Sequence, residues 1–354
     1  MLPHVRPDHR PWLEAWAAAS YGPGGFWQRE SPGAHFRTAA ASSTALAEMI
    51  SQLLAQHSEI RAVVDLGAGD GDLLDALADL RPDLGLVGID IRVRPAGRAG
   101  SVEWRRDVWD VDSSGWQFRE LDRVLSTIGQ PVLIMGVEWL DDLPCAVVGG
   151  GPDDWREMEV SPLGDERPGD HVECDDVRWL HEWWPVGRSA EVGSTRDTAW
   201  ASVIASLRPY GGLALLIDYG HLRSDRPAAG SLAAYQSGRW VPAVPGTDRN
   251  LTAAVAVDAV RAAGERAGAG TILLARQADV VSRNERARSF PAQYAGSNRR
   301  RASASGAVPT HDRGTRAPLA DLVVRSQRAA LRSPYVWGGQ WWLLQQVPAA
   351  PVAA

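Results

Sequence analysis

The sequence predicts an α/β fold in which helices cover both faces of a doubly wound, mostly parallel sheet. Residues 61–90 have the pattern of a strand, a glycine-rich turn, a helix and a second strand that ends in an acid. Residues 131–135 are a short apolar run, typical of a strand buried on both faces. Residues 197–218 read as a helix, a turn and an apolar strand that again ends in an acid. This alternation favours a parallel sheet with a ligand crevice at the carboxyl ends of its strands.

The first of these stretches has the features of a nucleotide-binding unit. Its first strand, residues 62–64, runs into the turn Asp-Leu-Gly-Ala-Gly-Asp-Gly, and leucines at helical spacing follow as far as Pro82. The glycines let the backbone approach a ligand closely, and the helix N-terminus presents free N–H groups. The second strand ends at Asp90, whose carboxylate is suited to accept two ribose hydroxyls.

The spacing of the glycines separates two kinds of nucleotide. A dinucleotide-binding fingerprint has a third glycine where this chain has Asp72, and a carboxylate at the helix start would repel a pyrophosphate. The pattern D-x-G-x-G-x-G instead resembles the first motif of class I S-adenosylmethionine (SAM) methyltransferases, whose cofactor lacks phosphate and carries positive charge. The resemblance implies SAM as the cofactor and, as residues that bind it, Asp65, Gly67, Gly69, Gly71 and Asp90. A glycine turn that serves packing alone is the alternative.

The composition limits the classes of function. With 354 residues the chain is long enough for one elaborated domain or two. A net charge of −6 gives no bulk reason to expect a nucleic-acid partner. All 37 basic residues are arginine, which excludes a Schiff-base lysine and the lysine of a phosphate-binding loop. With two cysteines, no signal peptide and no apolar run that spans a bilayer, we expect a cytoplasmic protein without a membrane partner.

Residues 1–60 are expected to form an N-terminal helical or lid segment, ahead of a SAM-binding domain of residues 61–354. Residues 11–20 and 45–54 have helical character. Between them lie Phe26, Trp27 and Phe36. These aromatic residues either clasp the N-terminal segment onto the domain or cover the cofactor, and both interpretations stay open.

Two acids follow the third and fourth strands. Asp107 comes after the strand at residues 101–104 and is a candidate partner of the adenine amino group, with capping of a turn as the alternative. Glu138 comes after the strand at residues 131–135, where a substrate would be met, with an ion pair to an arginine as the alternative. The neighbouring Asp141–Asp142 pair reads as a cap of the next turn.

Residues 145–195 do not read as a layer of the sheet and are predicted to be an inserted cap over the site. Residues 147–160 look like a hairpin, and an acidic stretch with three tryptophans follows. His171, Cys174 and His181 match no zinc-binding spacing, so we expect no metal site.

A second match to the methyltransferase class follows this segment. A helix, the sequence L-x-P-x-G-G, an apolar strand at residues 213–217 and the terminal Asp218 resemble the fifth-strand region of class I methyltransferases. The fold class is therefore predicted as a class I methyltransferase Rossmann-like doubly wound sheet with an N-terminal helical segment and an inserted cap.

The resemblance extends to one family over roughly residues 20–260. The chain resembles the MidA family of SAM-dependent methyltransferases, which includes a mitochondrial complex I assembly factor that dimethylates a protein arginine. The segments that carry this resemblance are YGPGGFW, PGAHFRT, VVDLGAGDG, GVEWLDDLP, DDWREMEV, GGLALLIDYG and GSLAAYQSGRWVPAVPGTDRNLTAAV. Two departures stand out: Ala68 replaces the proline of the family's first motif, and Val137 replaces an asparagine beside Glu138.

The C-terminal third holds a biased segment. Residues 283–318 are rich in Arg, Ser, Gly, Ala and Pro and are predicted to be a flexible loop. Its basic cluster at residues 299–301 is expected to be solvated, with contact to nucleic acid or an acidic partner as the alternative. Residues 319–331 read as a helix, and residues 341–344 as a last edge strand.

The resemblance implies a SAM-dependent methyltransferase with a protein acceptor, and arginine is the candidate side chain. Glu138, together with Asp218, would then hold the guanidinium and turn one nitrogen toward the methyl group. Two other classes of function stay open. An NAD-type oxidoreductase is disfavoured by Asp72, and a SAM-binding assembly factor without turnover is kept open by Val137. The sequence names neither the acceptor nor an oligomeric state.

Overall fold

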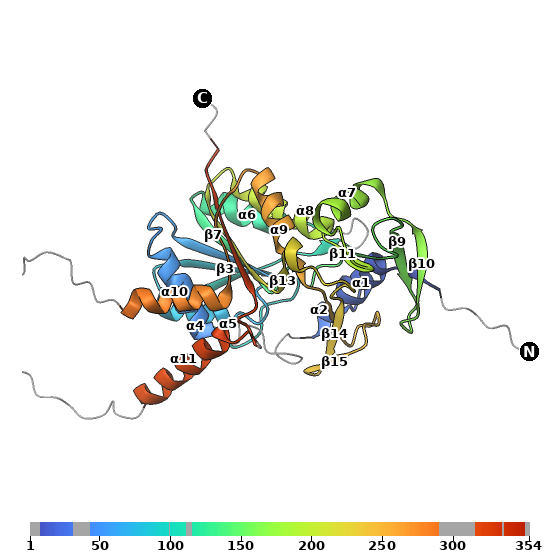
Figure 1. Ribbon diagram of the computed structural model, residues 1–354. Coiled ribbons are helices and arrows are strands. Elements are labelled where there is room, and N and C mark those ends of the chain that lie inside the picture. The colour runs from blue at the N-terminus through green and yellow to red at the C-terminus, as the bar shows by residue number, and fades with distance from the viewer. Residues whose placement is uncertain are drawn as a thin grey trace, which may run out of the picture.

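The computed structural model describes residues 8–30, 43–98, 100–110, 115–289, 316–334 and 336–350. Its centre is a seven-stranded sheet (Figure 1). From one edge to the other the strands are β4 (Val102–Arg106), β3 (Gly85–Asp90), β2 (Ala62–Leu66), β7 (Val132–Val137), β12 (Gly212–Asp218), β19 (Trp341–Val347) and β18 (Gly270–Arg276). The first five are parallel, and β19 runs antiparallel to both of its neighbours. The predicted fold class is confirmed.

Helices cover both faces of this sheet, as Figure 1 shows. One face carries α4 (Ser43–Leu54), α5 (Asp72–Leu80), α10 (Gln277–Ser289) and α11 (Arg316–Arg332), and the other α6 (Arg119–Ile128), α8 (Ser194–Leu207) and α9 (Val257–Arg266). Neighbouring residues of one strand pack on opposite faces of the sheet, because side chains alternate along a strand. Val63 packs in the core with α4 and α5, whereas Val64 packs in the core with α6 and α8.

The place of β19 corrects one expectation. Residues 341–344 were expected to form an edge strand, but β19 lies inside the sheet and β18 forms the edge. Nearly all of β19 is buried, whereas exposed and half-buried residues dominate β18. A continuous apolar run is the pattern of a strand covered on both faces, so Trp341–Leu344 fits the interior position.

Residues 146–192 form a second sheet, which corrects the prediction that residues 145–195 contain no sheet layer. The order is β1 (Arg10–Pro11), β9 (Arg156–Val160), β8 (Ala146–Gly149) and β11 (Ser189–Val192), and β10 (Glu166–His171) pairs with β9. The predicted hairpin at residues 147–160 is present as the antiparallel β8–β9 pair. Helix α7 (Cys174–Trp183) packs on this sheet through Trp179 and Leu180.

The N-terminal helices join the two sheets. Trp12 and Trp16 of α1 (Trp12–Tyr21) pack against the second sheet, while Phe26 and Trp27 of α2 (Phe26–Arg29) pack in the core of the central sheet. The burial of both aromatic residues supports the clasp interpretation, and Phe36 lies outside the described residues. The domain boundaries at residues 60 and 61 stay a prediction. Residues 290–315, most of the predicted flexible loop, also lie outside the described part.

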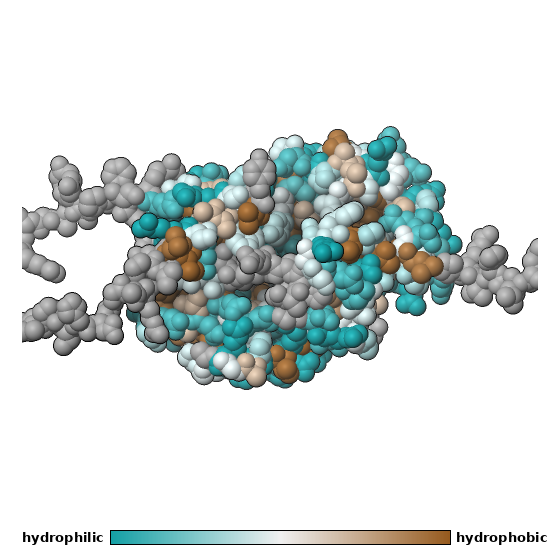
Figure 2. Space-filling view, turned by 90° about the horizontal axis from the view of Figure 1, so that it is seen from below, coloured by the Kyte–Doolittle hydropathy of each residue, from teal (hydrophilic) through white to brown (hydrophobic). Residues whose placement is uncertain are grey.

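Short elements complete the described chain around the carboxyl ends of the central strands. They are β5 (Trp109–Asp110), β6 (Gly115–Trp116), β13 (Gly220–His221), the 3₁₀ helix η2 (Arg223–Asp225), β14 (Ala233–Gln236), β15 (Arg239–Val241), β16 (Asn250–Thr252) and β17 (Val255–Ala256). The face in Figure 2 is mainly hydrophilic, with hydrophobic residues in small groups. Within the described ranges, no helix combines the length and apolar character needed to cross a bilayer.

Candidate active site

The glycine loop between β2 and α5 depends on backbone conformations that favour glycine. Gly67, Gly69 and Gly71 have φ angles of 67°, 60° and 81°, all in the left-handed region. A Cβ atom on Gly67 would also lie 2.8 Å from Cδ1 of Trp139. Side chains at these positions would strain the loop, so the loop keeps its backbone N–H groups at the end of β2.

Asp90, at the end of β3, organises this loop. Its Oδ2 accepts the N–H of Gly69 at 2.8 Å, and its Oδ1 accepts the backbone N–H of Arg92 at 2.9 Å and Arg92 Nε at 3.3 Å. A carboxylate has about four acceptor positions, so three are used and one is left for a further donor such as a ribose hydroxyl. Two hydroxyls would require the Arg92 side chain to move. No sequence pattern marks this arginine as part of the site; it also contacts Asp70 at 3.1 Å.

Asp65, inside β2, supplies buried negative charge beside the loop. It is 4% exposed, and no hydrogen bond to its side chain is present among the described residues. Burial, together with the nearby Asp90, raises the pKa of the Asp65 carboxyl well above its usual range. Burial also raises the pKa of Asp90, although Arg92 acts against the shift. A cationic ligand would offset the cost of burying these carboxylates. Their buried negative charge is therefore the electrostatic complement of the sulfonium and ammonium groups of SAM.

Asp107 follows β4 and is buried at the start of α6. Its Oδ1 accepts the N–H of Val108 at 3.0 Å, and its Oδ2 accepts the N–H of Glu120 at 3.2 Å. The bond from Glu120 satisfies a backbone donor in the first turn of α6, which is the capping role considered as the alternative. A contact between Asp107 and adenine stays a prediction.

A separate pocket lies beyond β7 and β12. It has a volume of about 440 Å³, and its lining is acidic and aromatic. The lining residues are Glu138, Asp141, Asp142, Tyr219, Ser231, Ala233, Tyr235, Asn250, Thr252, Ala253, Ala254 and Val336. No basic side chain is among these described residues, so the pocket presents three carboxyl groups and two tyrosines to a ligand.

Glu138 stands on the turn directly after β7, where the sequence predicted it. Its φ is 50°, and its backbone N–H donates to the Ile217 carbonyl at 2.8 Å. A non-glycine residue in this region costs free energy, and such residues concentrate at functional sites. Its Oε1 accepts a hydrogen bond from Nε2 of the buried Gln340 at 2.6 Å.

Asp218 lies under this turn and does not line the pocket. It is fully buried, and its Oδ2 accepts the backbone N–H of Leu140 at 2.9 Å and those of Trp139 and Asp141 at 3.3 Å. Burial raises the pKa of Asp218 well above its usual range, and Asp141 and Glu138 act in the same direction. Asp218 therefore holds the turn that carries Glu138, and a direct catalytic contact of its carboxyl group stays a prediction.

Asp141 and Asp142 belong to the pocket wall, which corrects their interpretation as turn caps. Asp141 Oδ2 accepts the Thr252 hydroxyl at 2.9 Å, and Asp142 Oδ1 accepts Asn250 Nδ2 at 2.9 Å. Burial raises the pKa of both carboxyl groups, well above the usual range for Asp142, whose second cause is the charge of Asp141. Strand β16 thus fixes both acids toward the pocket.

Arg196, on α8, connects the backbone segments that form the pocket walls, although its side chain does not line the pocket. Its buried guanidinium donates to the carbonyls of Leu143 at 3.1 Å, Ala253 at 3.0 Å and Asp141 at 2.9 Å. It also lies 5.6 Å from the centroid of the Trp16 ring. One arginine therefore links the turn after β7, the segment after β16 and helix α1. Arg196 belongs to no recognisable motif, so this role could not be predicted from the sequence.

Comparisons with known proteins agree with this geometry. Residues 100–273, just under half of the chain, match a family described as "Putative S-adenosyl-L-methionine-dependent methyltransferase". A "likely methyl transferase" from Burkholderia thailandensis, solved with S-adenosyl-homocysteine, superposes with a TM-score of 0.67 at 19% identity over 97% of this chain and 89% of that one. An uncharacterized protein from the same organism gives 0.69 at 20% identity over 97% and 88%. The fold is that of a class I SAM-dependent methyltransferase. No curated protein matches the chain.

The family match bears out the predicted enzyme class, a SAM-dependent methyltransferase, and SAM as its cofactor. The residues present fit that cofactor, because the glycine loop, Asp65 and Asp90 combine backbone donors with buried negative charge. The family match does not identify the molecule or group that accepts the methyl group.

Proposed function

We propose that this methyltransferase, as the MidA resemblance implies, modifies a protein and that the acceptor group is the guanidinium of an arginine. The observation that carries the proposal is the pocket beyond β7 and β12, with its three carboxyl groups, two tyrosines and no basic residue among the described lining. A guanidinium remains protonated at every physiological pH, so its site must supply negative charge.

The charges of the pocket match such an acceptor. Burial makes Asp142 costly to ionise when the pocket holds no cation, as its raised pKa indicates. A guanidinium reverses this cost because carboxylates bind it through paired, charge-assisted hydrogen bonds. The aromatic faces of Tyr219 and Tyr235 add a cation–π contribution.

The roles of the residues follow from their positions. SAM supplies the methyl group from its sulfonium. Asp65, the glycine loop and Asp90 bind the cofactor at the ends of β2 and β3. Glu138 fixes the guanidinium and directs one nitrogen toward the methyl group. When the N–CH₃ bond forms and the S–CH₃ bond breaks, that nitrogen loses a proton, and the carboxylates of the pocket are the nearest acceptors for it. Asp218 acts by positioning Glu138.

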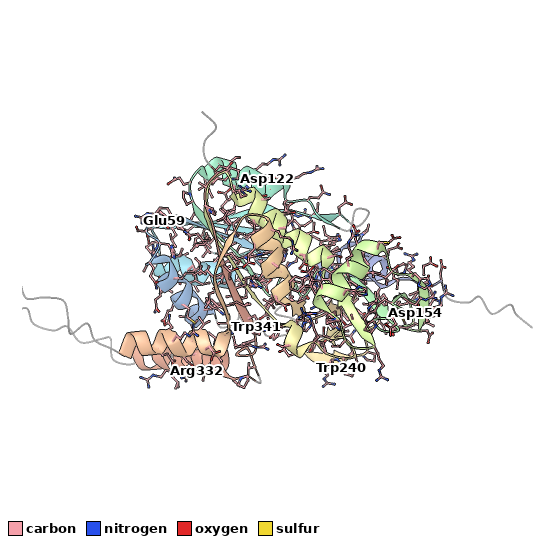
Figure 3. The ribbon with its side chains drawn as sticks, turned by 45° about the horizontal axis from the view of Figure 1, so that its top comes forward. Glu59, Asp122, Asp154, Trp240, Arg332 and Trp341 are labelled. Atoms are coloured by element: carbon pink, nitrogen blue, oxygen red, sulfur yellow. The ribbon has the colours of Figure 1, made fainter. Side chains whose placement is uncertain are left out.

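A protein, rather than a small molecule, is favoured by the surface beside the pocket. Tyr235 of β14 lines the pocket and lies opposite Trp240 of β15, so the two rings share one face of the hairpin. Trp240 is 68% exposed, at the outer surface of this hairpin (Figure 3). A large exposed aromatic ring beside an acceptor pocket suits contact with residues that flank the modified arginine.

An assembly factor without turnover is less well supported. The alternative rested on Val137 in place of the family's asparagine, but Val137 packs in the core with α4 and α5 and does not line the pocket. Its side chain therefore removes no polar group from the pocket wall. The cytoplasmic location stays a prediction.

The test uses SAM with a labelled methyl group, an extract of the source cells, and the Glu138→Gln variant. We expect labelled protein that yields methylarginine on hydrolysis. The variant should keep SAM affinity and lose methyl transfer by about 100-fold or more, the scale of a positioned catalytic group. Glu103→Gln, a change of an exposed glutamate on β4, is the matched control. Label in a small molecule, or in another side chain, would contradict the proposed acceptor.

A further inference from the structure

Gln340 is a buried amide in contact with the residue on which the proposed function depends. It directly precedes β19, is fully buried, and donates from Nε2 to Glu138 Oε1 at 2.6 Å. The two residues are 202 positions apart in the sequence. In Figure 3 the neighbouring Trp341 lies between Arg332 and Trp240.

The orientation of this amide is set by a chain of hydrogen bonds behind it. The indole N–H of Trp342, which can only donate, donates to Gln277 Oε1 at 2.9 Å. Because Oε1 of Gln277 faces Trp342, its Nε2 faces the other way. This Nε2 donates to the Trp337 carbonyl at 2.9 Å and to Gln340 Oε1 at 3.2 Å. The backbone N–H of Gln277 also donates to the Gln340 carbonyl at 2.8 Å.

The direction of these hydrogen bonds determines which atom of Gln340 faces Glu138. Because Gln340 Oε1 accepts from Gln277, only Nε2 of Gln340 is left to face Glu138. The amide therefore always offers Glu138 a donor. A hydrogen-bond donor favours the charged form of a carboxyl group and fixes the position of the oxygen that accepts it.

We propose that Gln340 is a positioning residue that holds the Glu138 carboxylate, in ionised form and in a fixed rotamer, toward the acceptor pocket. The inference rests on the proposed function only for the role of Glu138 in methyl transfer. The acidic groups around Glu138 oppose its ionisation, so a hydrogen-bond donor is needed to favour the charged form. Asp142 and Asp218 face Glu138 from its own turn and from β12, and each of them, when ionised, disfavours a further negative charge there. Tyr219 also faces Glu138, but its raised pKa keeps it uncharged.

Gln340→Met is the test variant, because methionine has a similar volume and lacks the donor. Gln345→Met is a matched control. Gln345 is also fully buried on β19, and its amide bonds to Trp200, Arg261 and Thr271 rather than to the pocket. A third variant, Gln277→Met, keeps Gln340 but removes the partner that orients it.

The first readout needs no acceptor. Carboxyl signals of ¹³C-labelled glutamate are followed against pH in the full chain, with Glu138 assigned by its absence in Glu138→Gln. We expect its titration to move to higher pH by roughly one pH unit in Gln340→Met, less in Gln277→Met, and not at all in Gln345→Met. An unchanged titration in Gln340→Met, or an equal shift in Gln345→Met, would overturn the inference.

The second readout is methyl transfer. We expect Gln340→Met to reduce kcat by roughly tenfold or more at unchanged SAM affinity, while Gln345→Met keeps the rate of the unchanged protein. If Gln340→Met does not fold, the titration of Gln277→Met decides, and its failure to move would overturn the inference. A protein that transfers no methyl group to arginine, yet shows the expected titrations, would count against the proposed function and support the positioning role.

Discussion

The Asp197→Asn substitution should stabilise the protein by an amount that grows as the pH rises from about 4 to about 7. Asp197 is 6% exposed on α8; its Oδ2 accepts the indole N–H of Trp179 at 2.8 Å, while its buried Oδ1 has no hydrogen-bond partner in the described structure. Burial raises the pKa of Asp197 from 3.8 to about 7. The ionised side chain is therefore poorly accommodated in the folded protein. Asparagine keeps an oxygen for Trp179 and carries no charge.

The magnitude follows from the interval between the two pKa values. Between about pH 4 and pH 7 the folded protein holds a proton that the unfolded chain has released, so the free energy of unfolding falls as pH rises. The interval from 3.8 to about 7, at about 1.36 kcal/mol per pKa unit, corresponds to roughly 4 kcal/mol above pH 7. The variant lacks this loss. Its advantage over the unchanged protein should be near zero at pH 4 and should grow to that size by pH 8.

Urea unfolding at a series of pH values measures this difference. Asp83→Asn is a control of opposite sign, because the Arg81 side chain lowers the pKa of exposed Asp83 to about 2. That variant should lose stability relative to the unchanged protein as the pH rises from about 2 to about 4. A constant difference between Asp197→Asn and the unchanged protein from pH 4 to pH 8 would refute the reasoning.

Three further predictions concern ligands. SAM and S-adenosylhomocysteine should raise the melting temperature and NAD should not. A ligand at about 100 times its Kd adds about 2.7 kcal/mol to the free energy of unfolding. Equal protection by NAD in a thermal scan would disprove the cofactor assignment. Asp90→Ala should weaken SAM binding by roughly 10- to 100-fold in calorimetry while unfolding stays cooperative, because a charged acceptor is lost; unchanged affinity would move the ribose contact elsewhere. Trp240→Ala should raise the KM for the protein acceptor by about tenfold with kcat unchanged, whereas Leu163→Ala, at another exposed apolar site, should not; an equal effect of both would remove the hairpin from acceptor binding.

Local patterns in the sequence were sufficient to predict the elements that carry the candidate cofactor site. The strand at 62–66, the helix at 72–80 and the strand at 85–90 each follow from their own hydrophobic spacing. Gly67, Gly69 and Gly71 were recognisable because positive φ angles favour glycine. Glu138 was recognisable because the end of a buried parallel strand faces the crevice.

The proposed acceptor pocket could not be predicted in the same way, because its walls join distant parts of the chain. Asn250 and Asp142 are 108 positions apart, and Gln340 and Glu138 are 202 apart. Neither pair leaves a periodic signal. The second sheet was missed for a different reason: β10, with the sequence Glu-Arg-Pro-Gly-Asp-His, is polar and contains proline, as edge strands often are.

The position of β19 has a consequence for how the protein is made. Residues 341–347 lie between β12 and β18, although they leave the ribosome after both. Until they arrive, one edge of β12 has no partner and β18 has no sheet to join. The nucleotide-binding half, at residues 61–90, is synthesised early and can form first. Gln340 reaches Glu138 only when β19 is inserted, so this hydrogen bond depends on one of the last segments to be synthesised, whereas the glycine loop does not.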